Sequence, residues 1–205
     1  MKDAIFLGLN FQQFADITSG GIIALFILNI IFLILFFVNN FARGRIKPLG
    51  KIVNKIIYKT VDKTSYEYFV YILVFVLGLG IVGANIYEIV YGDKPCILCW
   101  YQRVMIYPMF ILLISELYFK TRVAHKFVAV LAFLTAAIGV YHYRFHYIRY
   151  VLGDLVSVPC SGNPLMPTCG EAGVVSFGFV TMPLMSVVMG VFVITVCYIL
   201  NKKSK

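Results

Sequence analysis

Two pairs of cysteines are the residues of this sequence whose spacing could carry chemistry. Cys96 and Cys99 stand three apart in "KPCILCWYQRVMIYPMF", directly before a strongly apolar run, and Cys160 and Cys169 follow with eight residues between them. Four cysteines can bind zinc, form two structural disulfides, or pass a disulfide from one pair to the other. Zinc would favour a Cys-x-x-Cys in both pairs, which the second pair lacks, so we expect no metal. Spacing alone leaves the structural and redox interpretations open.

Arg103 favours the redox interpretation. The first pair stands at the predicted start of a helix, where the helix dipole and free amides stabilise a thiolate. Arg103 follows Cys99 by four residues, which is one turn deeper on the same face, and an arginine inside an apolar helix indicates function by default. It could stabilise a Cys99 thiolate or bind a polar group of a ligand at the membrane edge. The alternative is an arginine that extends to the outer headgroups.

The chain as a whole has the composition of a polytopic membrane protein. Of its 205 residues, 61% are hydrophobic and 13% are charged, and its mean hydropathy is +0.89. One water-soluble core cannot bury that much apolar surface. A helix of about 20 residues crosses a bilayer, and five apolar runs approach or exceed that length. We therefore expect an all-α protein with membrane helices at residues 21–38, 68–90, 97–118, 127–147 and 177–200, the third and fifth interrupted by Pro108 and Pro183.

The basic residues predict the orientation of these helices. Most of the lysines and arginines lie in three regions, residues 43–63, 120–126 and 202–205, and five crossings place all three on the same side. Because cytoplasmic loops are enriched in lysine and arginine, we expect the N-terminus and both cysteine pairs outside and the C-terminus in the cytoplasm. The net charge of +9 is then explained by topology, and we expect no nucleic-acid partner.

The first 67 residues form a separate part of the predicted organisation. The run at 21–38 has no small-residue cleavage site after it, so we interpret it as a retained helix and not as a signal peptide. Lysines recur every four residues from Lys47 to Lys63, which predicts a basic amphipathic helix on the inner leaflet, with a solvated linker as the alternative. Residues 68–205 form the second part.

The second part resembles a known family. The stretch "PCILCWYQRVMIYP", the later Cys160 and Cys169, and "FGFVTMP" at 177–183 are similar to the bacterial disulfide bond formation protein B family, including its shorter-loop relatives. The resemblance covers roughly residues 68–200. It implies a four-helix transmembrane bundle in the bacterial cytoplasmic membrane, to which the helix at 21–38 is an addition of unknown role. It also implies a quinone-dependent thiol oxidase that reoxidises a soluble, DsbA-like thioredoxin-fold partner.

The resemblance also implies a role for each site residue. Cys99 would be the thiolate beside the quinone, which could be ubiquinone or menaquinone, and Arg103 would help to hold that quinone. Cys96 would exchange with the loop pair, in which Cys160 meets the partner and Cys169 completes the disulfide. His142 corresponds to the family's histidine in the fourth helix, one turn before His146. These two could bind a quinone carbonyl or carry its proton, or they could be interfacial residues of an aromatic belt.

Two other functions fit parts of the pattern. A vitamin K epoxide reductase-like quinone oxidoreductase also joins a membrane Cys-x-x-Cys to a loop pair, but there the loop pair comes first in the sequence. A non-enzymatic membrane protein with two structural disulfides would show no thiol exchange. We expect no special role for Glu88 and Glu116 near helix ends, for His125 on an inner loop surface, or for Cys197 as a buried apolar residue.

Overall fold

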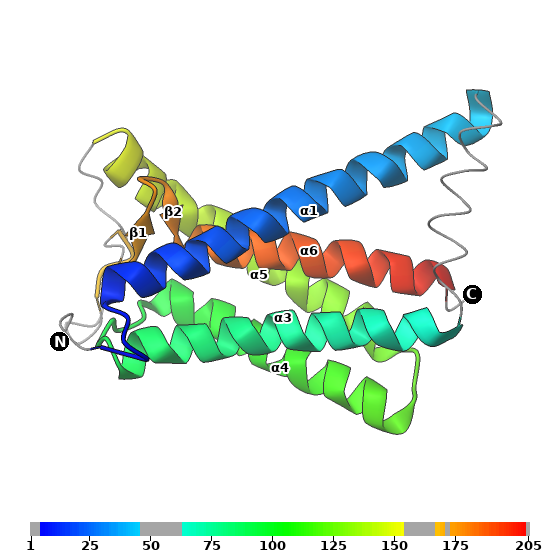
Figure 1. Cartoon of the computed structure of the whole chain (residues 1–205), viewed down its shortest axis with the longest axis horizontal. Helices are drawn as coiled ribbons and strands as arrows, with labels where there is room; N and C mark the ends of the chain where they lie inside the picture. The colour runs from blue at the N-terminus through cyan, green and yellow to red at the C-terminus, as the bar shows by residue number, and fades with distance from the viewer. Residues whose placement is uncertain (1–4, 46–62, 154–166, 171–172, 204–205) are drawn as a thin grey trace.

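A computed structural model describes residues 5–45, 63–153, 167–170 and 173–203. Within these ranges, five long helices run back and forth along the bundle (Figure 1). They are α1 (Phe11–Arg45), α3 (Lys63–Ile89), α4 (Ile97–Phe119), α5 (Ala124–His146) and α6 (Met182–Lys203). Each contains a stretch long and apolar enough to cross a membrane, so the expected all-α polytopic fold is confirmed. The predicted amphipathic segment, apart from Lys63, and Cys160 lie outside the described residues.

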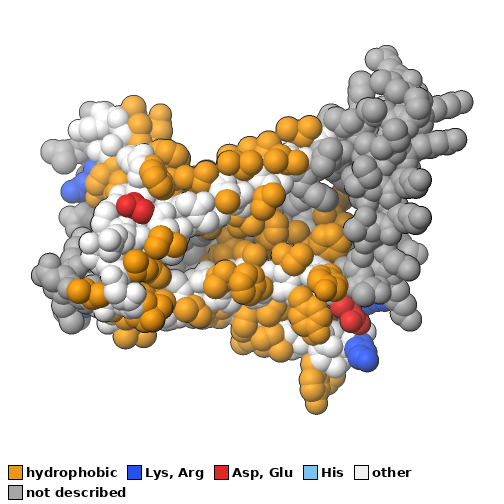
Figure 2. All heavy atoms as spheres, viewed as in Figure 1, with side chains coloured by type: hydrophobic (Ala, Val, Ile, Leu, Met, Phe, Trp, Pro, Cys, Tyr) orange, Lys and Arg blue, Asp and Glu red, His pale blue; other side chains and the backbone are white. Residues whose placement is uncertain are grey.

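The helices α3 to α6 enclose one apolar core. Its fully buried members include Leu73, Leu77, Leu113 and Val193, which come from three helices. The outer surface is apolar as well: Figure 2 shows hydrophobic side chains over most of the visible face, with charged side chains near its ends. A bundle that is apolar both inside and outside is the arrangement expected in lipid, where the hydrophobic effect does not sort residues between core and surface.

Small residues allow two of these helices to approach closely. α5 packs most extensively against α6. A Cβ atom built on Gly139 would lie 2.7 Å from Val187, and one built on Gly190 would lie 3.0 Å from the Ala132 carbonyl oxygen. Close approach at small residues is how membrane helices gain packing contacts. The tight α5–α6 pair fixes the position of His142 and His146 relative to the loop before α6.

Several helix boundaries differ from the sequence prediction: α1 ends at Arg45 and not at Val38, α3 begins at Lys63 and not at Tyr68, and the starts of α1 and α6 differ as well. α1 begins at Phe11, ten residues before the predicted start at Gly21, because the polar first turns carry too little hydropathy to register as membrane helix. α6 begins at Met182, because Val175–Ser176 (β1) and Val180–Thr181 (β2) form a short antiparallel hairpin instead of helix. Pro183 is therefore the second residue of α6, where proline is tolerated, and it does not interrupt the helix. Pro108 does lie inside α4, as expected.

A buried polar cluster at the end of the bundle opposite Cys96 and Cys169 corrects the prediction for His125. This histidine is fully buried and not on a loop surface. Its backbone N–H donates to Glu116 at 2.6 Å, its Nδ1 lies 3.1 Å from the same carboxylate, and the Tyr66 hydroxyl donates to Glu116 as well. Glu116 thus joins α3, α4 and α5, which the sequence prediction missed. Cys197, 2% exposed, is buried as predicted.

Candidate active site

The Cys-x-x-Cys pair occupies the first turn of α4. Cys96 is the N-cap residue, with extended backbone angles of φ −73° and ψ 172°, and Cys99 lies one turn inside the helix. The two sulfur atoms are 3.6 Å apart, the distance of a thiol hydrogen bond. Cys96 is buried, with 5% of its surface exposed. The predicted position of the pair at a helix N-terminus is therefore confirmed.

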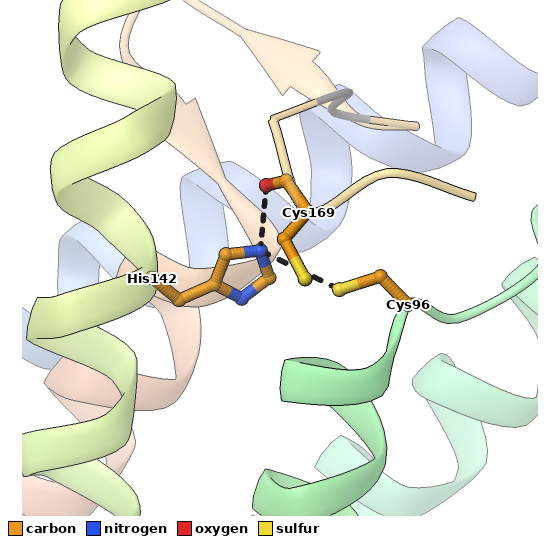
Figure 3. Close-up of side chains that lie close together, drawn as sticks. All are labelled: Cys96, His142 and Cys169. Atoms are coloured by element: carbon orange, nitrogen blue, oxygen red, sulfur yellow. Dashed lines mark hydrogen bonds between the residues drawn. The ribbon is translucent and has the colours of Figure 1, made fainter. Parts of the chain in front are cut away.

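A loop brings the third cysteine to the same place. Cys169 is fully buried, and its sulfur, the Cys96 sulfur and a ring nitrogen of His142 all lie within 4.8 Å of one another. Figure 3 shows the three side chains converging from the loop, the start of α4 and the end of α5. At this separation, a thiolate at one of the two cysteines can attack a disulfide that holds the other after small side-chain movements.

Two histidines hold the loop in position. The Nε2 atoms of His142 and His146 lie 3.1 Å and 3.0 Å from the backbone carbonyl oxygen of Cys169. Because a carbonyl oxygen can only accept, we assign the ring proton to Nε2 in both. Both rings are buried, at 1% and 3% exposure, so neither belongs to an interfacial aromatic belt. The family resemblance favoured His142 over His146, yet His146 makes an equivalent contact.

His142 also influences Cys96. Its Nε2 lies 3.6 Å from the Cys96 sulfur. The hydrogen bond from Cys99 and then this contact with His142 lower the pKa of the Cys96 thiol well below its usual range, and they outweigh the opposing effect of burial. This arrangement therefore favours the thiolate of the reduced pair on Cys96, beside both His142 and Cys169.

Arg103 is buried in the protein and not directed to the headgroups. Only 7% of its surface is exposed. Its guanidinium forms an ion pair with Glu88, donates to the Ala84 carbonyl oxygen at 3.0 Å, and lies 5.5 Å from the centre of the Trp100 ring. Glu88 is the partner that the sequence prediction missed, because the two residues belong to different helices.

A cavity of about 690 Å³ adjoins these residues. Its polar lining includes Cys96, Cys99, Gln102 and Arg103, and most of the side chains that α1, α3 and α6 contribute are apolar. Gln102 is 5% exposed, and its Nε2 has no hydrogen-bond partner among the described residues. A buried amide without a partner is costly, and here it can donate to an acceptor in the cavity. Gln102 was not predicted as a site residue, because its position in the sequence carries no sign of this role.

The comparison with known families decides what this site belongs to. Residues 67–200 match the family model described as Disulfide bond formation protein DsbB. The chain belongs to the DsbB family. Family membership supports a role in disulfide bond formation and an oxidoreductase activity, and it sets aside the vitamin K epoxide reductase-like alternative. α1 lies outside the matched DsbB region.

Individual members of the DsbB family show the same relationship. The chain is 33% identical to the SPbeta prophage-derived disulfide bond formation protein B of Bacillus subtilis, over 60% of this chain and 79% of the relative. It is 32% identical to disulfide bond formation protein C of the same organism, over 54% and 77%, and 32% identical to a probable disulfide formation protein of Coxiella burnetii, over 60% and 82%. No solved structure is significantly similar to the chain.

Proposed function

We propose that this protein oxidises an extracytoplasmic thioredoxin-fold dithiol oxidase and passes the electrons to a membrane quinone. The observation that carries the proposal is the convergence of Cys96, Cys169 and His142 within 4.8 Å, beside a cavity that Cys96 and His142 line. A structural disulfide pair would need neither a histidine against its sulfur nor a neighbouring cavity with an unpartnered amide. A redox relay needs both an exchange point and an electron acceptor.

The thiol chemistry proceeds by exchange in balanced steps. A thiolate of the partner attacks Cys160 in the Cys160–Cys169 disulfide and releases Cys169 as a thiolate. Cys169 then attacks Cys96 in the Cys96–Cys99 disulfide, which forms Cys96–Cys169 and releases Cys99. The second thiol of the partner resolves its mixed disulfide and leaves oxidised with Cys160 free. Cys160 finally attacks Cys169, which restores the loop disulfide and releases Cys96 as a thiolate.

In these steps Cys99 and Cys96 are thiolates at different stages of the reaction. While Cys96 is bound to Cys169, the free thiolate of the pair is Cys99, the residue that the family resemblance places beside the quinone. Once the loop disulfide has re-formed, Cys96 takes the charge, because its hydrogen-bonding contacts with Cys99 and His142 stabilise the thiolate. The lowered pKa of Cys96 also makes it a good leaving group when Cys160 attacks.

The cavity fits a quinone. An isoprenoid quinone has a ring with two carbonyl acceptors and a long apolar tail, and the cavity has donors at one end and apolar walls along the rest. The Nε2 of Gln102 and the guanidinium of Arg103 are the groups that would hold the ring. A bound quinone would accept two electrons from the reduced Cys96–Cys99 pair, one proton from the Cys99 thiol and a second proton from solvent, because Cys96 is already a thiolate. Ubiquinone and menaquinone share these features.

The proposed orientation places the cysteine end of the bundle outside the cytoplasm. α1 begins, α4 begins and α5 ends at that end. At the opposite end, Lys120 and Arg122 lie between α4 and α5, and Lys126 lies in the first turn of α5. Their position supports a cytoplasmic location for that end.

Quinone reduction by the purified protein tests the proposal. With a reduced thioredoxin-fold dithiol protein as substrate, the wild-type protein should reduce added quinone with one quinone consumed per disulfide formed. Cys99→Ala should abolish quinone reduction, whereas Cys197→Ala, which changes a buried cysteine at the other end of the bundle, should retain it. Equal activity of the two variants, or wild-type protein that oxidises the dithiol without consuming quinone, would contradict the proposal.

A further inference from the structure

One face of α1 forms a wall of the cavity. Six of its residues border the cavity, and they recur at intervals of three and four, as positions on one helical face do. They are Phe14, Ile17, Thr18, Gly21, Ile22 and Leu25. Figure 2 shows the surface hollowed between α1 and α3. Since α1 lies outside the DsbB-matched region, this wall is an addition to the core of the family.

Specific contacts hold α1 in this position. The hydroxyl groups of Thr18 and Tyr87 are 2.6 Å apart, and Tyr91 donates to the Leu9 carbonyl oxygen at 3.1 Å. Phe11 and Phe14 pack edge-on against Tyr87. These contacts connect the first turns of α1 to the end of α3 that carries Glu88, the partner of Arg103. The wall is therefore fixed to the same helix end as the polar part of the cavity.

Two glycines leave space between the walls. A Cβ atom built on Gly21 of α1 or on Gly83 of α3 would meet nothing within 4 Å, and both residues line the cavity. A glycine inside a helix costs about 1 kcal/mol relative to alanine. Close packing accounts for Gly80, where a Cβ would lie 2.9 Å from the Met189 sulfur, but it does not account for Gly21 or Gly83. Their position on the lining means that the missing side chains leave room inside the cavity.

The lining chemistry indicates which part of a ligand meets α1. Gln102 and Arg103 of α4 supply donors at the cysteine end, and the α1 wall contributes apolar side chains, a glycine and a threonine whose hydroxyl is already bonded to Tyr87. An apolar wall with no free donor suits the ring face and tail of a quinone and not its carbonyl groups. The side chains of α1 thus limit the width of the ligand, and those of α4 orient it.

We propose that α1 completes the quinone cavity and that Gly21 determines how large a quinone it admits. The inference rests on the proposed function, because it takes the occupant to be the quinone of that reaction. It assigns to the added helix a role in quinone selection. A wider side chain at Gly21 would project into the cavity and compete with the ring or tail for the same volume.

Gly21→Leu and its neighbour Gly20→Leu form a matched pair for the test. Both glycines have open space at the Cβ position, but only Gly21 lines the cavity. Binding is measured without turnover, through quenching of Trp100, the single tryptophan of the chain, by short-tailed quinones. Gly21→Leu should weaken binding about tenfold, the lower part of the range for misfit in an apolar pocket. In Gly21→Leu the affinity for a two-ring naphthoquinone should fall more than the affinity for a one-ring benzoquinone. Gly20→Leu should bind both quinones with the affinity of the wild type.

The outcomes separate this inference from the proposed function. Equal binding by Gly21→Leu and the wild type, or equal losses in Gly21→Leu and Gly20→Leu, would overturn the role of α1 while the proposed function stands. If Gly21→Leu does not fold, the smaller Gly21→Ala should still bind naphthoquinone more weakly than the wild type. Unchanged binding by Gly21→Ala would also overturn the role of α1. Wild-type protein that binds no quinone would overturn both proposals.

Discussion

Replacing Arg103 with alanine tests its proposed contact with quinone. The guanidinium is buried and borders the cavity. A hydrogen bond that involves a charged group contributes about 1.5 to 3 kcal/mol, so loss of this contact should lower kcat/KM for quinone by about ten- to 150-fold. The same change leaves the Glu88 carboxylate without its ion-pair partner, and an unpaired charge can disturb the site by itself.

The double variant Arg103→Ala/Glu88→Gln separates these two effects. It removes the stranded carboxylate together with the guanidinium, so a defect caused by stray charge should disappear and a defect caused by a lost quinone contact should persist. Quinone reduction is followed by absorbance over a range of quinone concentrations. Disulfide exchange with the reduced partner in a single turnover without quinone is the control, and it should be unchanged. A kcat/KM near the wild-type value in the double variant would refute the quinone contact and leave Arg103 as a structural partner of Glu88.

Two further predictions follow from the buried contacts. The lowered pKa of Cys96 keeps its thiolate present as pH falls from about 8 to about 5, so alkylation of Cys96 in the reduced protein should hardly change over that range. In His142→Ala the pKa should rise and alkylation should slow as pH falls, measured by mass spectrometry of the Cys96 peptide; identical profiles would contradict the role of His142. Glu116→Ala should lower the free energy of unfolding by about 1 to 3 kcal/mol, because it leaves buried donors of His125 unpaired. Thermal unfolding measures this, and an unchanged midpoint would show that the cluster does not stabilise the bundle.

The sequence predicted those features that depend on local composition. Long apolar runs identify membrane helices without knowledge of their neighbours, since each helix satisfies its own backbone hydrogen bonds. The placement of Cys96 and Cys99 at the start of α4, and of Arg103 one turn deeper, follows from the same local reasoning. The starts of α1 and α6 were wrong for a related reason. Hydropathy does not register a polar helical turn before the membrane, and it does not distinguish an apolar hairpin from an apolar helix.

The sequence could not predict contacts between separate helices. Glu88 and His125 looked ordinary because their partners, Arg103 and Glu116, are identified only when helices pack side by side. Gln102 was overlooked because its interest comes from a buried amide that lacks a hydrogen-bond partner. A pattern of residues in the sequence does not show which side chains lack partners. The approach of Cys169 to Cys96 likewise depends on a loop held by two histidines of α5. Such contacts are properties of packing and become visible only with coordinates.

Disulfide formation between Cys96 and Cys169 is the most direct test of the proposed relay. The double variant Cys99→Ala/Cys160→Ala removes the other cysteine of each pair. Cys96 and Cys169 can then form a disulfide at their end of the bundle only with each other. After mild oxidation, peptide mass spectrometry should find one intramolecular Cys96–Cys169 disulfide in most molecules, with Cys197 still a free thiol. Recovery of Cys96 and Cys169 as free thiols under conditions that oxidise the wild-type pair, or of disulfides that link two copies of the protein, would contradict electron transfer through this pair.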